Sequence, residues 1–114
     1  MVCREELTVK HEMRGGKGDV YIYHVLSAEE LMGHGTLYAR VVLPPGSSIG
    51  YHQHIGNTEP YYILRGNGVF MDADGSRIPV GPGDVCRIAC GESHGMENTG
   101  TEDMEFMALV LNEA

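Results

Sequence analysis

The sequence predicts an all-β fold, in which many short strands form a β-sandwich or barrel. The chain has 16 glycines and 5 prolines in 114 residues. Its apolar residues alternate over short runs, with no long segment of helical periodicity. Glycine and proline at this density favour tight turns between short strands. A chain of this length forms a single domain, residues 1–114, around one core.

The first half of the chain contains four expected strands and one helical turn. The strands cover residues 7–11, 20–25, 36–43 and 50–54. A glycine-rich loop, residues 14–18, separates the first two, and Pro44-Pro45-Gly46 separates the last two. A helical turn is expected over residues 27–32, because Ser27 is a typical N-cap residue and Glu30, three positions later, completes a capping box.

The second half contains only strands and turns. The expected strands cover residues 61–64, 69–71, 77–80, 84–89, 94–98 and 104–111. Gly66-Asn67-Gly68 is expected to join the first two as a hairpin, and Asp72-Ala73-Asp74-Gly75 leads into the third. Gly81-Pro82-Gly83 marks the next corner. Strands in such quick succession are typical of a closed or two-layered β architecture.

Four residues have the types and spacing of metal ligands. His52 and His54 stand two positions apart on an expected strand, so their imidazoles project from the same face. Glu59 follows the short turn 55–58, and a hairpin is expected to return its carboxylate to the same point. His94 arrives from a distant strand. Imidazole and carboxylate together suit a divalent transition metal.

The glycines around these residues strengthen the prediction. One block runs Gly46, five residues, His52, one residue, His54, four residues, Glu59, six residues, Gly66. A second runs Gly83, five residues, Ala89, Cys90, Gly91, two residues, His94, three residues, Asn98. Together they resemble the two conserved motifs of the cupin family, over residues 46–66 and 83–98. The second block departs once, with Ala89 where the family usually has proline.

The resemblance implies a double-stranded β-helix, or jelly-roll barrel, with one divalent metal held by His52, His54, Glu59 and His94. Manganese or iron is the expected ion, while nickel, zinc, cobalt and copper stay open, since spacing does not select among them. Three histidines and one carboxylate leave two positions of an octahedral ion for substrate, water or dioxygen. The alternative is a polar barrel mouth that binds no ion.

Strand parity predicts the surroundings of the metal. Tyr61 and Ile63 share the face of Glu59, and Met96 shares the face of His94. Tyr38 and Phe106 are expected to supply further walls from their strands. The pocket then consists of a metal beside a mostly apolar wall, which suits a small organic ligand with one polar end.

Tyr61 and Arg40 are the candidate catalytic residues. If its strand turns Tyr38 and Arg40 inward, Arg40 can bind a substrate carboxylate through two hydrogen bonds. The alternative is that Arg40 lies on the surface or rim, because nothing fixes the parity of its strand. Tyr61 is expected beside the ligands as a hydrogen-bond donor.

The family resemblance does not select a function, because cupins include enzymes and binding modules. The chain resembles one half of the two-domain oxalate decarboxylases, but Ile49 stands where those enzymes carry an arginine three residues before the first metal histidine. The favoured hypothesis is a metal-dependent enzyme of decarboxylase or dioxygenase type acting on a small anionic molecule, with a carboxylate as the expected ligand. A non-catalytic binding or sensing module, an isomerase or lyase for sugars or small acids, and a metal protein that mainly supports assembly are the alternatives.

Charge and cysteine usage limit the partners. The formal net charge of -8 argues against nucleic acid and anionic membranes, which usually require a basic patch. No export signal is visible at the amino terminus, and three cysteines, an odd number, favour a reducing compartment, so a cytoplasmic location is expected. The resemblance also suggests a homodimer in which the first strands, residues 7–25, cover a neighbouring copy.

Overall fold

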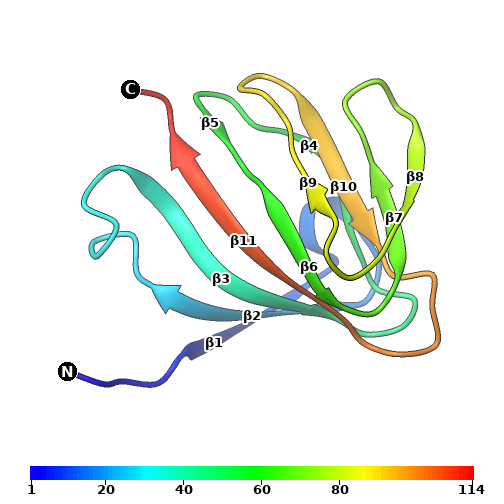
Figure 1. Cartoon of the computed structure of the whole chain (residues 1–114), viewed down its shortest axis with the longest axis horizontal. Helices are drawn as coiled ribbons and strands as arrows, with labels where there is room; N and C mark the ends of the chain where they lie inside the picture. The colour runs from blue at the N-terminus through cyan, green and yellow to red at the C-terminus, as the bar shows by residue number, and fades with distance from the viewer.

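The computed structural model describes residues 1–114 and contains two facing antiparallel sheets (Figure 1). The larger sheet has the order β1-β2-β3-β11-β6-β9, with β5 also paired to β11, and the smaller has the order β4-β10-β7-β8. The elements are β1 (Glu6–His11), the 3₁₀ turn η1 (Met13–Gly15), β2 (Asp19–Leu26), β3 (Gly35–Leu43), β4 (Ser48–Gln53), β5 (Asn57–Thr58), β6 (Tyr61–Arg65), β7 (Gly68–Met71), β8 (Arg77–Val80), β9 (Val85–Cys86), β10 (Ser93–Glu97) and β11 (Met104–Asn112). The arrangement is the expected double-stranded β-helix.

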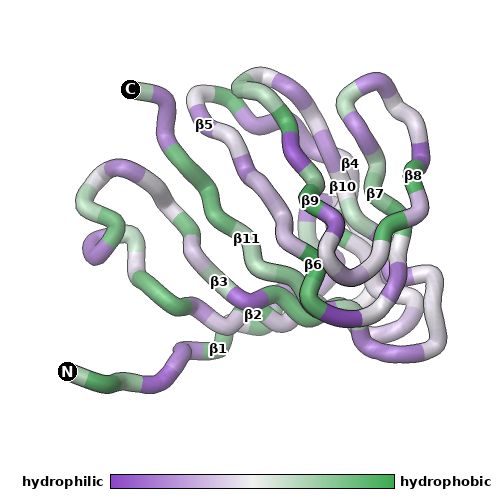
Figure 2. The backbone as a smooth tube through the Cα atoms, in the orientation of Figure 1, coloured by the Kyte–Doolittle hydropathy of each residue, from purple (hydrophilic) through white to green (hydrophobic).

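The core lies between the two sheets. One row of directly paired residues, Ile22, Val41, Phe106 and Ile63, crosses β2, β3, β11 and β6 and is buried along its whole length. Figure 2 shows apolar residues concentrated along β11, the central strand of the larger sheet. Burying such a row removes apolar surface from water and supplies most of the driving force for packing.

The observed strands and their pairing correct three predictions made from the sequence. β4 lies in the smaller sheet and β6 in the larger, so residues 54–60 cross between sheets and form no hairpin. β6 and β7 likewise lie in different sheets, whereas β7 pairs with β8 across the turn expected over residues 72–75. The strand expected over residues 84–89 is limited to Val85–Cys86. Alternation locates a strand, but it does not identify the partner strand.

The expected helical turn near Ser27 is only partly formed. The capping box is present, because the backbone N–H of Ser27 donates to Glu30 and the backbone N–H of Glu30 donates to the Ser27 hydroxyl. Residues 28–33 form hydrogen-bonded turns but no regular helix. Met32 and Gly33 both have positive φ and end the segment after one turn. No helix in the structure is long and apolar enough to span a membrane.

Candidate metal centre

Strand register brings the four candidate ligands together. His94 on β10 is directly opposite His52 on β4, and His54 follows at the end of β4. Glu59 comes from the other sheet, just before β6. His54, Glu59 and His94 are buried, and His52 is partly buried. Tyr51 and Gln53 are exposed, as the alternation of β4 predicts.

Three imidazole nitrogens and one carboxylate oxygen converge. Nε2 of His54 lies 3.1 Å from Nε2 of His52 and 3.0 Å from Nε2 of His94. Oε1 of Glu59 lies 3.1 Å from Nε2 of His54 and 3.2 Å from Nε2 of His94. All four atoms lie within 4.8 Å of one another. Adjacent ligands of an octahedral ion with bonds of ~2.1 Å are roughly 3 Å apart, so this spacing fits a single ion.

Two of the histidines are oriented by hydrogen bonds to their other ring nitrogen. Nδ1 of His52 lies 2.6 Å from the carbonyl oxygen of Gly50, and Nδ1 of His54 lies 2.7 Å from Oδ1 of Asn57. Both oxygens only accept, so each Nδ1 carries a proton and donates it. In a neutral ring Nε2 then holds a lone pair. Two lone pairs facing each other at 3.1 Å need a cation, which is the arrangement of metal-binding histidines.

The charges of the metal-free site follow from the same contacts. Burial raises the pKa of Glu59, but hydrogen bonds from His54 and His94 outweigh it and lower the pKa from 4.5 to about 2. The hydrogen bond to Glu59 raises the pKa of His54 above its ordinary 6.5. Burial lowers the pKa of His52. Protons on the histidines and a metal ion therefore compete for the same lone pairs.

Tyr61 lies against this cluster. Its hydroxyl is 3.3 Å from Oε1 of Glu59 and 3.4 Å from Nε2 of His94, and its ring stacks on that of His94 at a centroid distance of 4.9 Å. Burial raises the pKa of Tyr61 well above 10.0. The hydroxyl is therefore protonated at neutral pH and donates a hydrogen bond to the carboxylate.

The cavity beside the site differs from the expected pocket. His52, Glu59 and Tyr61 border it, and the remaining lining is Met13, Val20, Ile22, Leu37, Val41, Ile49 and Ala108. Ile63, Met96 and Phe106, which were expected to line it, belong to the buried core instead. The cavity measures about 20 Å³, which is room for about one water molecule. A larger hollow of about 640 Å³, between the N-terminal strand and the Ser27 turn, contains none of the four ligands.

Arg40 and Tyr38 do not face the site. Ala39 and Val41 of β3 point into the core, so Tyr38 and Arg40 occupy the opposite face of the sheet. The guanidinium of Arg40 pairs with Glu5 at 2.5 Å and with Glu105 at 2.9 Å, and it lies 4.1 Å from the centre of the Tyr23 ring. The inward orientation considered from the sequence is therefore wrong, and the surface alternative is correct.

Asn57 and the loop that contains Met13 were not expected at the site. Asn57 orients His54, and its place in the turn between His54 and Glu59 is the signal that identifies it in retrospect. Met13 has no such signal, because its loop reaches the site only through folding of a distant segment onto β4. The rings of Phe70 and His94, which lie 5.9 Å apart edge to face, were also not anticipated.

Comparison with known proteins identifies the family. A family model described as a cupin domain matches residues 39–110. The chain belongs to the cupin family. This cupin is 52% identical over 99 residues to the oxalate-binding protein of Thermotoga maritima, an alignment that covers 87% of this chain and 81% of the relative. The family resemblance seen in the two motif blocks is confirmed.

Two further proteins are similar to this cupin. The crystal structure of a predicted oxalate decarboxylase from Thermotoga maritima matches this cupin with a TM-score of 0.93 and 48% sequence identity, covering 98% of this chain and 99% of that one. A glucose-6-phosphate isomerase from Thermococcus kodakarensis is 30% identical over 112 residues, which cover 86% of this cupin and 59% of the isomerase. The similarity to the isomerase therefore covers only part of that enzyme.

Proposed function

We propose that this cupin binds one divalent transition metal through His52, His54, Glu59 and His94 and takes a small carboxylate of the oxalate type at the open positions of that metal. The observation that carries the proposal is the pair of Nε2 lone pairs on His52 and His54, held 3.1 Å apart by Nδ1 hydrogen bonds to other groups. The relative named as an oxalate-binding protein supports a carboxylate.

Manganese or iron is the proposed ion, and nickel, cobalt, copper and zinc also suit the ligand set. Three imidazoles and a carboxylate are borderline ligands that accept any of these metals. Elemental analysis of protein purified without an affinity tag identifies the ion carried from the cell. Mass spectrometry of the same preparation identifies any carboxylate that survives purification.

Binding is tested by calorimetry on the manganese-loaded protein. Oxalate is titrated into loaded protein and into protein stripped with a chelator. We expect one oxalate per chain in the loaded protein and none in the stripped protein. Equal binding to both forms would place the carboxylate elsewhere and contradict the proposal.

Turnover of the bound ligand, as a decarboxylase or dioxygenase, is the second candidate function. The observation that favours it is the Tyr61 hydroxyl, which keeps its proton beside Glu59 and His94, and we propose that this hydroxyl donates to a bound carboxylate. A bound metal supplies a Lewis acid or an oxygen activator. Manganese- and iron-loaded protein is assayed with carboxylic acids, 1,3-diketones and sugar derivatives. Tight binding without turnover of any compound would favour the binding or sensing role.

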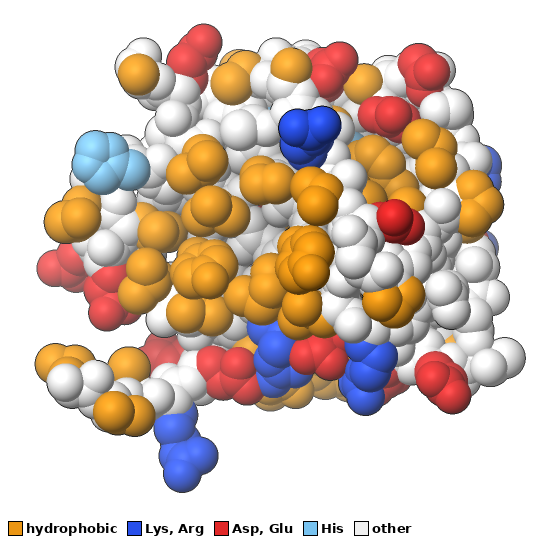
Figure 3. Space-filling model, viewed as in Figure 1, with side chains coloured by type: hydrophobic (Ala, Val, Ile, Leu, Met, Phe, Trp, Pro, Cys, Tyr) orange, Lys and Arg blue, Asp and Glu red, His pale blue; other side chains and the backbone are white.

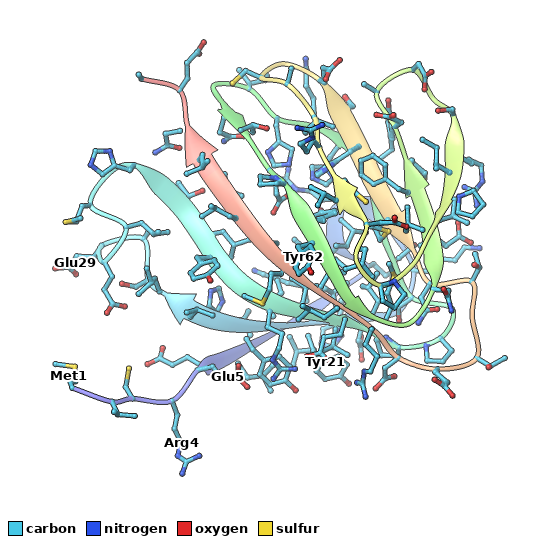
Figure 4. The ribbon with its side chains drawn as sticks, viewed as in Figure 1. Met1, Arg4, Glu5, Tyr21, Glu29 and Tyr62 are labelled. Atoms are coloured by element: carbon cyan, nitrogen blue, oxygen red, sulfur yellow. The ribbon has the colours of Figure 1, made fainter.

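We also propose that the protein forms a homodimer through the outer face of its larger sheet. One row of paired residues, Leu7, Tyr23, Arg40, Met107, Tyr62 and Val85, crosses six strands on that face. Leu7, Tyr62 and Val85 are each about half exposed. Figure 3 shows apolar side chains gathered over β3, β11 and β6, and Figure 4 labels Tyr62, which belongs to this face. An exposed apolar face of this extent favours a protein partner, and a second copy is the proposed one.

The proposed location is the cytoplasm. All three cysteines are free, and Cys86 is buried, where burial raises the pKa of its thiol to about 11. A protein with three unpaired thiols suits a reducing compartment.

A further inference from the structure

The cavity beside the candidate ligands is too small for a carboxylate in the conformation that the structure shows. Its volume of about 20 Å³ accommodates about one water molecule, and even oxalate has several times as many atoms as water. Two of the four ligands, His52 and Glu59, border the cavity together with Tyr61. A carboxylate that approaches the metal from this side therefore requires part of the cavity wall to move.

The residues that form the wall differ in their exposure to solvent. Most of them are buried, namely Val20, Ile22, Val41, Ile49, Glu59, Tyr61 and Ala108. The remaining three, Met13, Leu37 and His52, are partly exposed. Buried side chains in a closely packed core have little room to move aside. The three partly exposed residues therefore mark the mouth of the cavity.

Two of these three residues are held by a sheet. His52 lies in β4 opposite His94, and its Nδ1 donates to the carbonyl oxygen of Gly50 at 2.6 Å. Leu37 lies within β3, where it is paired with Val110 of β11. Met13 belongs to neither sheet, because it is the first residue of the 3₁₀ turn η1. Met13 is therefore the mouth residue that the fold restrains least.

The loop that carries Met13 is nevertheless fixed against β4. A Cβ at Gly16 would collide with the carbonyl oxygen of Ser48, so the two backbones approach as closely as only glycine permits. The backbone N–H of Lys17 donates to the Ser48 hydroxyl, and the backbone N–H of Ser48 donates to the carbonyl of Lys17, both at 2.9 Å. These contacts hold the loop as a unit.

The backbone around Met13 is also fixed locally. Glu12 and Arg14, the residues on either side, both have positive φ, at 49° and 56°. This region is unfavourable for a residue with a side chain, and it persists where the surrounding structure enforces it. The carbonyl of Met13 accepts a hydrogen bond of 2.9 Å from the backbone N–H of Gly16. Movement at the mouth is therefore assigned to the Met13 side chain and not to its backbone.

A methionine side chain is well suited to this movement. It is unbranched and has three rotatable bonds, so it adapts its shape more easily than a branched or aromatic side chain. Rotation of a partly exposed side chain takes place in picoseconds to nanoseconds, without opening the fold. When the Met13 side chain turns outward, the cavity gains the space of one side chain, while the buried part of the wall stays in place.

We infer that Met13 sets the size of the carboxylate that the metal centre admits, because its side chain must turn outward before a ligand can occupy the cavity. The inference rests on the proposed function and adds a size limit to it. The space released by one methionine suits a short carboxylate such as oxalate. A longer dicarboxylate such as succinate would also have to displace buried core residues, so the site rejects it.

The test changes the bulk of residue 13 in both directions. Met13→Ala removes the side chain from the mouth, and Met13→Phe replaces it with a larger and stiffer one. Met71→Ala is the matched control, because Met71 is also partly exposed but lies in β7, outside the cavity lining. Calorimetry on the manganese-loaded proteins gives the affinities for oxalate and succinate. Elemental analysis gives the metal content, and thermal unfolding shows that each variant is folded.

We expect Met13→Ala to raise the affinity for succinate relative to oxalate by roughly 10-fold. Met13→Phe is expected to weaken oxalate binding by roughly 10-fold, because the ring cannot clear the mouth. Metal content is expected to stay at the wild-type value in both variants, since Met13 is not a ligand. Met71→Ala is expected to keep the wild-type affinities for both compounds.

The two directions keep the inference testable if one variant does not fold. Wild-type affinities for oxalate and succinate in the folded Met13 variants would overturn the role of Met13 and leave the proposed function intact. The same changes in Met71→Ala would show a general effect of losing a methionine and would also overturn it. Failure of the manganese-loaded wild-type protein to bind oxalate would overturn the proposed function and, with it, this inference.

Discussion

Nε2 of His54 lies 3.0 Å from Nε2 of His94, although the two residues are 40 positions apart in the chain. Cross-strand pairing of β10 with β4 brings the two strands together. A contact this short between two ring nitrogens requires either a shared proton or a shared metal ion.

Replacing His54 with alanine is expected to abolish stoichiometric metal binding. His54 occupies the centre of the cluster, with contacts of 3.0 to 3.1 Å to Nε2 of His52, Nε2 of His94 and Oε1 of Glu59. The measurement is elemental analysis after dialysis against manganese. His34→Ala removes an exposed histidine outside the site and serves as the control. One metal ion per chain in His54→Ala would show that the proposed coordination is wrong.

Replacing Asn57 with leucine is expected to weaken metal binding by about 10- to 100-fold. The change removes the acceptor for Nδ1 of His54 and frees the ring to rotate or to change tautomer. Asn57→Asp keeps an acceptor oxygen and is expected to bind metal at least as tightly as wild type. Calorimetric titration of the stripped proteins gives the affinities. Equal metal affinity of the leucine variant and the wild-type protein would show that Asn57 does not support metal binding.

The metal-free protein is expected to lose stability both above and below a limited pH window. Glu59 has a folded pKa of about 2 against 4.5 unfolded, so its contribution is complete above pH 4.5 and is lost as the pH falls through about 2. His54 has a raised folded pKa, so its contribution is complete below pH 6.5 and is lost as the pH rises through that raised value. The contribution of the pair is therefore complete between pH 4.5 and 6.5.

Chemical denaturation of stripped protein across this range measures the effect. Glu59→Gln removes the anion and is expected to flatten the dependence on both sides. Metal-loaded protein is expected to keep its stability above pH 6.5, because the metal replaces the protons on the histidines. A pH profile that is the same for wild type and Glu59→Gln would contradict the prediction.

Replacing Gly50 with alanine is expected to destabilise the protein by about 1–3 kcal/mol. The added Cβ would lie 2.0 Å from the carbonyl oxygen of Arg14, so the loop around η1 must shift away from β4. Gly100→Ala, whose nearest neighbours would be at 3.4 Å, is the control. Thermal unfolding gives the comparison. Equal stability of the two variants would show that the loop is not held against β4.

Replacing Leu64 with aspartate is expected to convert the proposed dimer to a monomer. Leu64 is 42% exposed on the outer face of β6, and a charge there would be buried in the interface at a high cost. Ile78→Asp is the matched control, because Ile78 is 41% exposed on β8 in the other sheet. Light scattering gives the molecular mass of each variant. A monomeric wild-type protein at micromolar concentration would contradict the dimer itself.

Local patterns in the amino-acid sequence were enough to predict the all-β fold, the parity of β4 and β10 and the identity of the four candidate ligands. These follow from local rules: alternation fixes which face a side chain takes, and glycines fix the turns between strands. The parity of β3 had no such anchor, so the side of the sheet occupied by Arg40 depended on which residues the core would bury. Pairing decided that Ala39 and Val41 face inward, and with them the outward position of Arg40.

The distant segments that border the site could be identified only from the packing of the folded chain. Met13 reaches it because Gly16 and Gly50 let the loop and β4 pack backbone against backbone, and Glu59 reaches it because residues 54–60 cross between the two sheets. Each of these contacts joins segments far apart in the sequence. The positions of these segments depend on how both sheets pack together, so they cannot be predicted from any local pattern of residues.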